Sequence, residues 1–164
     1  MSVSPKSTAP LSIGSKAPPF SLTDQSGVSH SLRELKDDFV VLFFYPKDNT
    51  PGCTLEAQEF TALKESFRKQ KSLIVGISGG TDRTKASFCK KFDLDVLLLS
   101  DTDFAVSTSY GVYGEKKFMG RKYLGIHRTT FVVNRDRRIA HVFESVKPQG
   151  HAEDVLGAIR ALRK

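Results

Sequence analysis

Seven consecutive apolar residues, Phe39-Val-Val-Leu-Phe-Phe-Tyr45, constrain the fold of this chain more than any other stretch. Successive side chains of a β-strand point to opposite faces of its sheet. A strand that is apolar at every position is therefore buried on both faces. The run predicts a central strand whose sheet is covered by helices on each side.

Further apolar runs supply partners for this strand. Strands are predicted at Leu73–Ile77, Val96–Leu99, Thr129–Val133 and Ile139–Phe143. The last two flank the turn Asn134–Arg137, so we expect them to form an antiparallel pair. An alternating pattern on each side of Asp24–Gly27 predicts a hairpin near the N-terminus.

Apolar residues spaced three or four apart predict the helices that cover this sheet. One helical face holds Ala57, Phe60, Leu63 and Phe67, a second helix covers Arg83–Phe92, and a third ends the chain with Val155, Leu156, Ile159 and Leu162. The order of elements predicts the α/β class: a mixed central β-sheet with helices on both faces and an N-terminal β-hairpin.

The 164 residues contain no internal repeat and no low-complexity block, so we expect a single domain over residues 13–164. Residues 1–12 are rich in Ser, Pro and Thr and lack the apolar segment of a secretory signal, so they predict a flexible tail. No run of about 18 apolar residues is present, and no membrane span or membrane partner is expected.

The chain has two cysteines and four histidines. Two cysteines are too few for a disulfide scaffold, so a reducing cytoplasm is the expected location and chemistry the expected use of the thiols. The histidines are scattered and no Cys-x-x-Cys occurs, which argues against a metal site and against a thioredoxin-type disulfide reductase.

The segment Pro46–Glu56 stands between the central strand and a predicted helix, where α/β folds build their sites. Thr50 followed by Pro51 is typical of a helix start, which makes Cys53 the third helical residue. Free backbone N–H groups and the positive end of the helix dipole favour a thiolate there, and the thiolate is the nucleophile. The alternative is a cysteine that only packs in the core.

The stretch Phe43-Phe-Tyr-Pro46-Lys-Asp-Asn-Thr50-Pro-Gly-Cys53-Thr contains the Pro-x-x-x-Thr-x-x-Cys pattern of the peroxiredoxins. Together with Tyr113–Gly120 and Gly125–Phe131, it resembles the peroxiredoxin Q/bacterioferritin comigratory protein branch, from about Gly14 to the C-terminus. The resemblance implies a thioredoxin-like fold, a thiol-dependent peroxidase acting on hydrogen peroxide and organic hydroperoxides, no cofactor and a monomer.

By the same resemblance Cys53 is the peroxidatic cysteine, Thr50 bonds the thiolate and the peroxide, and Pro46 shields the pocket. Arg128 holds the thiolate and polarises the peroxide; without the family context, it reads equally as a solvated arginine. Attack on an O–O bond develops negative charge, which four donors can stabilise: the Thr50 hydroxyl, the N–H groups of Gly52 and Cys53, and the guanidinium of Arg128. Glu56 is expected to face solvent or to pair with a cation.

In much of this branch a resolving cysteine lies five residues after the peroxidatic one, but Gln58 occupies that position here. The resemblance implies Cys89 instead, as the partner of Cys53 in an intramolecular disulfide that thioredoxin or a glutaredoxin-like dithiol reduces. Two separate helices rarely bring cysteines within disulfide reach. We therefore expect the first turn around Cys53, the helix carrying Cys89, or both, to unwind locally during turnover. The alternative is a Cys89 that only packs, with an external thiol resolving Cys53.

The net charge of +7 is concentrated between Glu115 and Arg138, where eight Lys and Arg face two acidic residues. Such a segment raises nucleic-acid binding as a function of a different class. The segment predicts loops and a turn with no recognition helix, so we expect no nucleic-acid partner.

Overall fold

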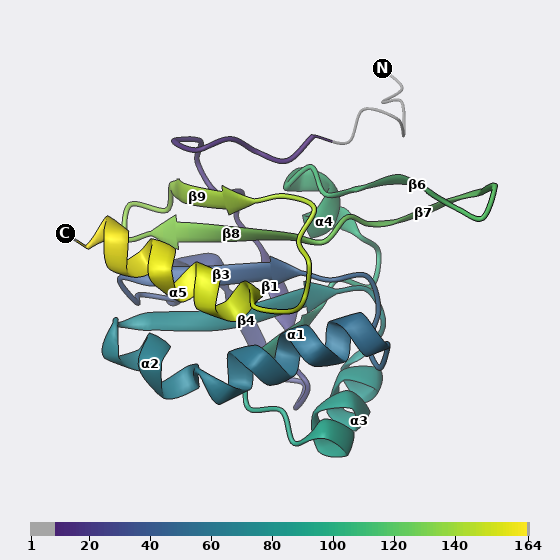
Figure 1. Ribbon diagram of the computed structural model, residues 1–164, viewed down its shortest axis with the longest axis horizontal. Coiled ribbons are helices and arrows are strands. Elements are labelled where there is room, and N and C mark those ends of the chain that lie inside the picture. The colour runs from purple at the N-terminus through teal and green to yellow at the C-terminus, as the bar shows by residue number, and fades with distance from the viewer. Residues whose placement is uncertain (1–8, 164) are drawn as a thin grey trace.

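A five-stranded mixed sheet forms the centre of the structure, a computed structural model that describes residues 9–163 (Figure 1). Its strand order is β5-β4-β3-β8-β9. The strands are β3 (Phe39–Phe44), β4 (Ser72–Ser78), β5 (Leu97–Ser100), β8 (Thr129–Asn134) and β9 (Ile139–Phe143). β3 is parallel to β4, and β4 to β5, whereas β8 is antiparallel to both β3 and β9. The predicted central strand and the predicted antiparallel pair are therefore confirmed.

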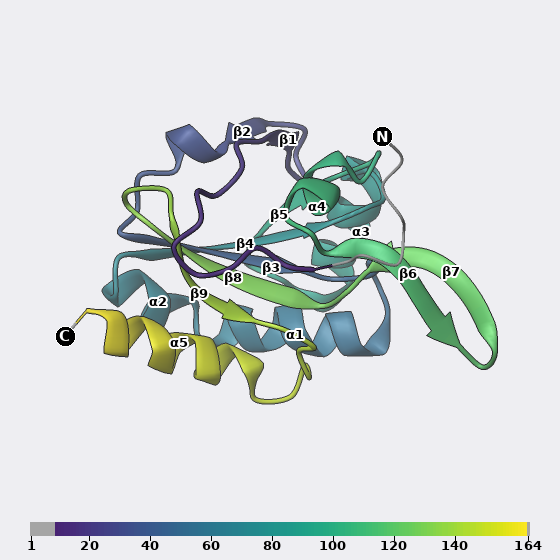
Figure 2. The same cartoon turned by 90° about the horizontal axis from the view of Figure 1, so that it is seen from above.

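Helices cover both faces of the sheet (Figure 2). One face packs against α1 (Pro51–Ala62), α2 (Lys64–Lys69), α3 (Asp82–Phe92) and α5 (His151–Leu162). The other face packs against α4 (Ala105–Ser109) and the N-terminal segment that contains β1 (Ser21–Thr23), β2 (Ser29–Ser31) and the 3-10 turn Leu32–Glu34. The expected α/β class with an N-terminal hairpin is confirmed.

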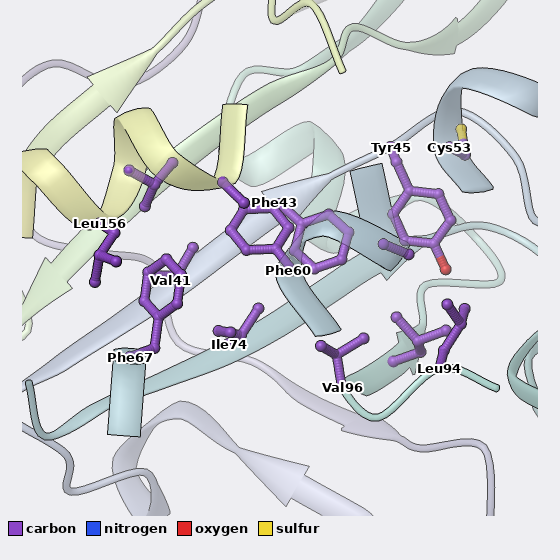
Figure 3. Packing of buried hydrophobic residues seen from close by; sticks show 14 of the residues in the cluster. Val41, Phe43, Tyr45, Cys53, Phe60, Phe67, Ile74, Leu94, Val96 and Leu156 are labelled. Carbon is purple, nitrogen blue, oxygen red and sulfur yellow. The ribbon is translucent and has the colours of Figure 1, made fainter. Parts of the chain in front are cut away.

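Alternate side chains of β3 enter two separate hydrophobic clusters, as a strand buried on both faces requires. Val41, Phe43 and Tyr45 pack toward α1 and α5, whereas Val40 and Phe44 pack toward α4. Phe43 stacks on Phe60 of α1 with ring centroids 4.7 Å apart. Figure 3 shows this stack and, beyond Tyr45, the sulfur of Cys53 at the end of the same cluster. The core therefore fixes α1 against the central strand.

Two elements differ from the sequence prediction. The helical face from Ala57 to Phe67 is divided between α1 and α2, because the chain leaves helical geometry at Leu63, with φ −99° and ψ 8°. The segment expected to hold loops and a turn forms a hairpin, β6 (Tyr113–Phe118) and β7 (Arg121–Ile126). Its strands escaped prediction because both of their faces bear charged residues, which hides the alternation of a half-buried strand.

The predicted tail lies partly outside the described residues, which begin at Ala9. Within them, the N–H of Leu11 donates to the carbonyl of Tyr110 at 3.3 Å. No helix in residues 9–163 is long and apolar enough to cross a membrane.

Candidate active site

The loop after β3 delivers Cys53 to the first turn of α1. Thr50 is the N-cap residue with extended backbone, Pro51 is the first helical residue, and the thiol is third, as predicted. The first backbone bond of the helix runs from the N–H of Thr54 to the carbonyl of Thr50 at 2.8 Å. The N–H groups of Gly52 and Cys53 precede it and have no backbone acceptor in the described part of the chain, so they are free to stabilise an anion. Cys53 itself is 1% exposed.

The antiparallel pairing of β3 with β8 brings Arg128 to this helix end. Phe44, near the end of β3, lies opposite Thr129, the first residue of β8, so the preceding Arg128 emerges beside the loop that leads to Cys53. Nη2 of Arg128 donates to Sγ of Cys53 at 3.4 Å, and Nη1 donates to Oε1 of Glu56 at 2.7 Å. A contact between residues 75 positions apart thus follows from the sheet register.

Gly52 has no side chain, and the guanidinium of Arg128 lies next to where a side chain would begin. A Cβ added at Gly52 would lie 3.2 Å from Nη2 of Arg128 and 3.4 Å from Cγ of Pro148. Arg128 therefore packs directly over the backbone of the first helical turn.

Glu56 is completely buried, one turn along α1 from the thiol. Of the two expectations, pairing with a cation is confirmed, and exposure to solvent is wrong because Arg128 draws the carboxylate inward. Burial raises the pKa of Glu56 to about 7, although Arg128 pulls it down. Within residues 9–163 its Oε2 atom has no hydrogen-bond partner, and it lies 3.9 Å from Nε2 of His151. That nitrogen and the hydroxyl of Thr130 share a hydrogen bond of 2.7 Å. Burial lowers the pKa of His151 to about 4, so this imidazole is neutral at pH 7.

A negative charge on Cys53 acts on the pKa values of two cations, Arg128 and Lys116. Burial opposes the charge of Arg128, but Cys53 and Glu56 outweigh burial and raise the pKa of Arg128. Burial also lowers the pKa of Lys116, with Arg128 adding to that effect and Cys53 opposing it. Nζ of Lys116 is held by the carbonyl of Ile126 at 2.8 Å. Sequence reasoning missed Lys116, because it is one of several lysines in a charged hairpin.

Thr50 and Pro46 border the same loop. The Thr50 hydroxyl donates to the carbonyl of Lys47 at 2.8 Å and does not cap a helical N–H. Because this proton is engaged, the expected hydrogen bond from Thr50 to the Cys53 sulfur is not formed in this arrangement. The Thr50 oxygen is available as an acceptor toward a molecule beside Cys53. Pro46 lies two residues after the end of β3 and is half-buried.

Cys89 lies on α3 and packs against the same hydrophobic cluster that contains Cys53. Both cysteines are free thiols. Burial, with Asp48 adding to it, raises the pKa of Cys89 to about 11. In this arrangement Cys89 is a protonated thiol and a weak nucleophile.

A buried ion pair that sequence reasoning missed ties the loop before Cys53 to the helix with Cys89. Lys85 of α3 is fully buried, and its Nζ donates to Oδ2 of Asp48 at 3.1 Å, to Ser78 at 2.9 Å and to the carbonyl of Gly79 at 2.6 Å. Tyr45 donates to the other oxygen of Asp48 at 2.6 Å. The contact joins polar residues 37 positions apart, for which no local pattern exists.

In residues 9–163 no group of three or more His, Cys, Asp or Glu side chains could hold a metal ion. The chemistry that this site offers comes from a thiol, two cations and free backbone N–H groups.

Comparisons with known proteins show the family of this chain. The family model described as AhpC/TSA matches residues 13–142. The putative peroxiredoxin bcp of Helicobacter pylori strain J99 is 42% identical over 149 residues, covering 91% of this chain and 98% of that relative. Two solved structures of Xanthomonas campestris peroxiredoxin Q, each 35% identical to this chain with a TM-score of 0.83, are of single mutants. A serine replaces one cysteine in the first structure and another cysteine, 36 positions later, in the second.

Other solved structures confirm the thioredoxin-like fold. A mutant of Xylella fastidiosa PrxQ superposes with a TM-score of 0.89 at 31% identity, covering 95% of this chain and 99% of its own. Peroxidoxin BcpB of Mycobacterium tuberculosis gives 0.84 at 36% identity, covering 94% and 99%. The chain therefore belongs to the AhpC/TSA family, in its peroxiredoxin Q/Bcp branch, and is a thiol-dependent peroxidase.

Proposed function

We propose that Cys53 is the peroxidatic thiol and reduces hydrogen peroxide and organic hydroperoxides. The observation that supports this most directly is the 3.4 Å contact between Arg128 and Cys53 at a helix N-terminus with free N–H groups. A cation and backbone donors at one sulfur favour the thiolate and, later, the oxygen on which charge develops.

In the first step the thiolate attacks the terminal peroxide oxygen, which keeps its hydrogen. An S–O bond forms, the O–O bond breaks, and the leaving oxygen departs as an alkoxide or hydroxide that takes a proton from solvent. Arg128 and the N–H groups of Gly52 and Cys53 stabilise both oxygens. The Thr50 oxygen accepts a hydrogen bond from the peroxide, and Pro46 restricts water access.

In the second step Cys89 resolves the Cys53 sulfenic acid: the Cys89 sulfur attacks the Cys53 sulfur, the S–O bond breaks, and water leaves. The two cysteines are 36 positions apart, the same separation as the replaced pair in the Xanthomonas protein. Because burial raises the pKa of Cys89 to about 11, α3 must unwind locally before this thiol can ionise and reach Cys53.

In the third step thioredoxin or a glutaredoxin-like dithiol reduces the disulfide and restores both thiols. This cycle fits a monomer, because both cysteines belong to one chain, and it fits a reducing compartment such as the cytoplasm.

Peroxide consumption driven by a thioredoxin system, compared among wild type, Cys53→Ser and Cys89→Ser, tests this assignment. Cys53→Ser is expected to abolish turnover, and undiminished activity would overturn the role of Cys53. Mass spectrometry after one equivalent of peroxide is expected to find a Cys53–Cys89 linked peptide. Persistent Cys53 sulfenic acid, or a Cys53–Cys53 dimer, would mean instead that an external thiol resolves Cys53.

A further inference from the structure

The β6–β7 hairpin exposes apolar side chains that the catalytic site does not use. In residues 9–163, eight large hydrophobic residues are exposed, and four of them lie on this hairpin. Phe118 is 66% exposed and Met119 is 86% exposed, and Tyr123 and Leu124 follow on β7. The hairpin extends away from the central sheet in both views (Figures 1 and 2). Residues 117–124, which we call the arm, thus present an apolar tip to the surroundings.

The apolar side chains of the arm point in more than one direction. Residue pairing places Phe118 opposite Arg121 and Lys116 opposite Tyr123, so Phe118 and Tyr123 share one face of the hairpin. Leu124 lies on the other face, and Met119 lies in the two-residue turn with a φ of 51°. A protein partner docked on one face would leave the rest exposed, whereas a fluid interface surrounds such a tip on all sides.

Basic side chains lie among these apolar ones. Lys117, Arg121 and Lys122 are exposed, and Lys117 lies directly opposite Lys122. Like charges in directly opposed positions destabilise a hairpin unless an anion lies between them. The one acidic residue of the hairpin, Glu115, is near its base and 3.9 Å from Lys122. The charge of the arm therefore complements a layer of anionic groups.

We propose that the arm docks on the surface of an anionic phospholipid bilayer. Phe118 and Met119 enter the boundary between headgroups and acyl chains, and the basic side chains contact lipid phosphates. This attachment lies on the surface and needs no membrane-spanning helix. It also assigns a function to Lys117, Arg121 and Lys122, three basic residues that the peroxidase reaction leaves unused.

The base of the arm is tied to the active site, which fixes how the attached domain is held. Ring Nε2 of His127 lies 3.1 Å from the carbonyl of Glu115, and Arg128 follows in the chain. A six-residue strand spans about 20 Å, so the tip that contacts the bilayer lies about that far from the base of the hairpin.

Cosedimentation of the full chain with vesicles tests this proposal and requires no peroxide, so its outcome is independent of the proposed function. We expect binding to vesicles of equal parts phosphatidylcholine and phosphatidylglycerol, and little binding to phosphatidylcholine alone. Replacing Phe118 and Met119 by Ser should weaken binding about tenfold or more, because the buried apolar area is lost. Replacing Lys117, Arg121 and Lys122 by Gln should weaken it about fivefold per charge.

A matched control removes three positive charges from other elements. It combines Lys36→Gln, Lys69→Gln and Arg160→Gln, all at exposed positions. We expect this control to bind the anionic vesicles within about a factor of two of wild type, because its charges lie away from the arm. All variants should keep wild-type turnover of hydrogen peroxide without vesicles, which also verifies that they are folded.

Three outcomes would overturn the proposal. They are no binding of wild type to anionic vesicles, an equal loss in the control variant, and a dimer in sedimentation equilibrium that disappears when Phe118 and Met119 are replaced. The second would reduce the effect to the net charge of the chain. The third would make a second copy the occupant of the arm.

Discussion

Arg128 contacts both Cys53 and Glu56, because its two terminal nitrogens serve different partners. Nη1 is anchored by Glu56 at 2.7 Å, which directs Nη2 to the sulfur at 3.4 Å. A lysine has a single charged nitrogen and cannot make both contacts with a planar fork. We expect Arg128→Lys to slow oxidation of Cys53 by hydrogen peroxide about 10²- to 10³-fold, the cost of removing one preorganised donor.

Stopped-flow measurement of the second-order rate of Cys53 oxidation checks this expectation. Arg121→Lys is the matched control, because Arg121 is exposed on β7. Equal rates for Arg128→Lys and Arg121→Lys would contradict the role of the guanidinium.

Gly52→Ala offers a second test, with two measurements: the rate of Cys53 oxidation, which should fall, and the free energy of unfolding, which should not fall. An added Cβ lies 3.2 Å from Nη2 of Arg128, so Gly52→Ala should displace the guanidinium by a few tenths of an ångström. Small misplacements of reacting groups are costly, and we expect about a tenfold fall in the oxidation rate. The same change should leave the free energy of unfolding unchanged or raise it by about 0.4–1 kcal/mol, because alanine restricts the unfolded chain. A parallel loss of stability in urea denaturation would point to general damage of α1.

Among the elements, α3 is joined to the loop before α1 by Lys85 and Thr84, which both donate to Oδ2 of Asp48. Lys85 is fully buried, so Lys85→Met would leave the Asp48 carboxylate buried without its cation. Breaking a buried pair from one side costs about 3–5 kcal/mol, and we expect that loss in the free energy of unfolding measured with urea. Lys90→Met, at an exposed position on the same helix, is expected to change stability by less than about 0.5 kcal/mol.

A double variant separates the contribution of the Lys85–Asp48 ion pair to stability from the contribution of packing. Adding Asp48→Asn to Lys85→Met removes the unpaired charge, so it should restore part of the lost stability. If the two losses simply add, the pair makes no coupled contribution and the contact between these elements is held by other groups.

The sequence predicts the elements whose pattern is local, and it misses those that depend on distant partners. The continuous apolar run of β3 and the Thr50–Pro51 helix start are readable because each follows from a few neighbouring residues. The turn of the β6–β7 hairpin uses Met119 and Gly120 in place of the usual Asn-Gly, so it leaves no turn signal. The partners of Lys85 and Glu56 lie 37 and 72 positions away and become visible only in the fold.

At the scale of the whole molecule, two buried groups with opposite proton preferences shape the pH dependence of stability. Burial raises the pKa of Glu56 from 4.5 to about 7, so its contribution to stability is complete below pH 4.5 and is lost as pH rises through 7. Burial lowers the pKa of His151 from 6.5 to about 4, so its contribution is complete above pH 6.5 and is lost as pH falls through 4. Between pH 4.5 and 6.5 folding binds a proton at Glu56 and releases one at His151, and the two effects cancel.

Single substitutions should uncover these opposed effects. In His151→Gln, the proton uptake of Glu56 is no longer offset by His151. The free energy of unfolding, relative to wild type, should therefore fall as pH rises from 4.5 to 6.5. In Glu56→Gln, the proton release of His151 is no longer offset by Glu56. The free energy of unfolding, relative to wild type, should therefore fall as pH drops from 6.5 to 4.5. Each slope approaches about 1.4 kcal/mol per pH unit, the value for one proton. Urea denaturation at several pH values measures both, and slopes of the same sign in the two variants would contradict the proton balance, because one group must gain the proton that the other loses.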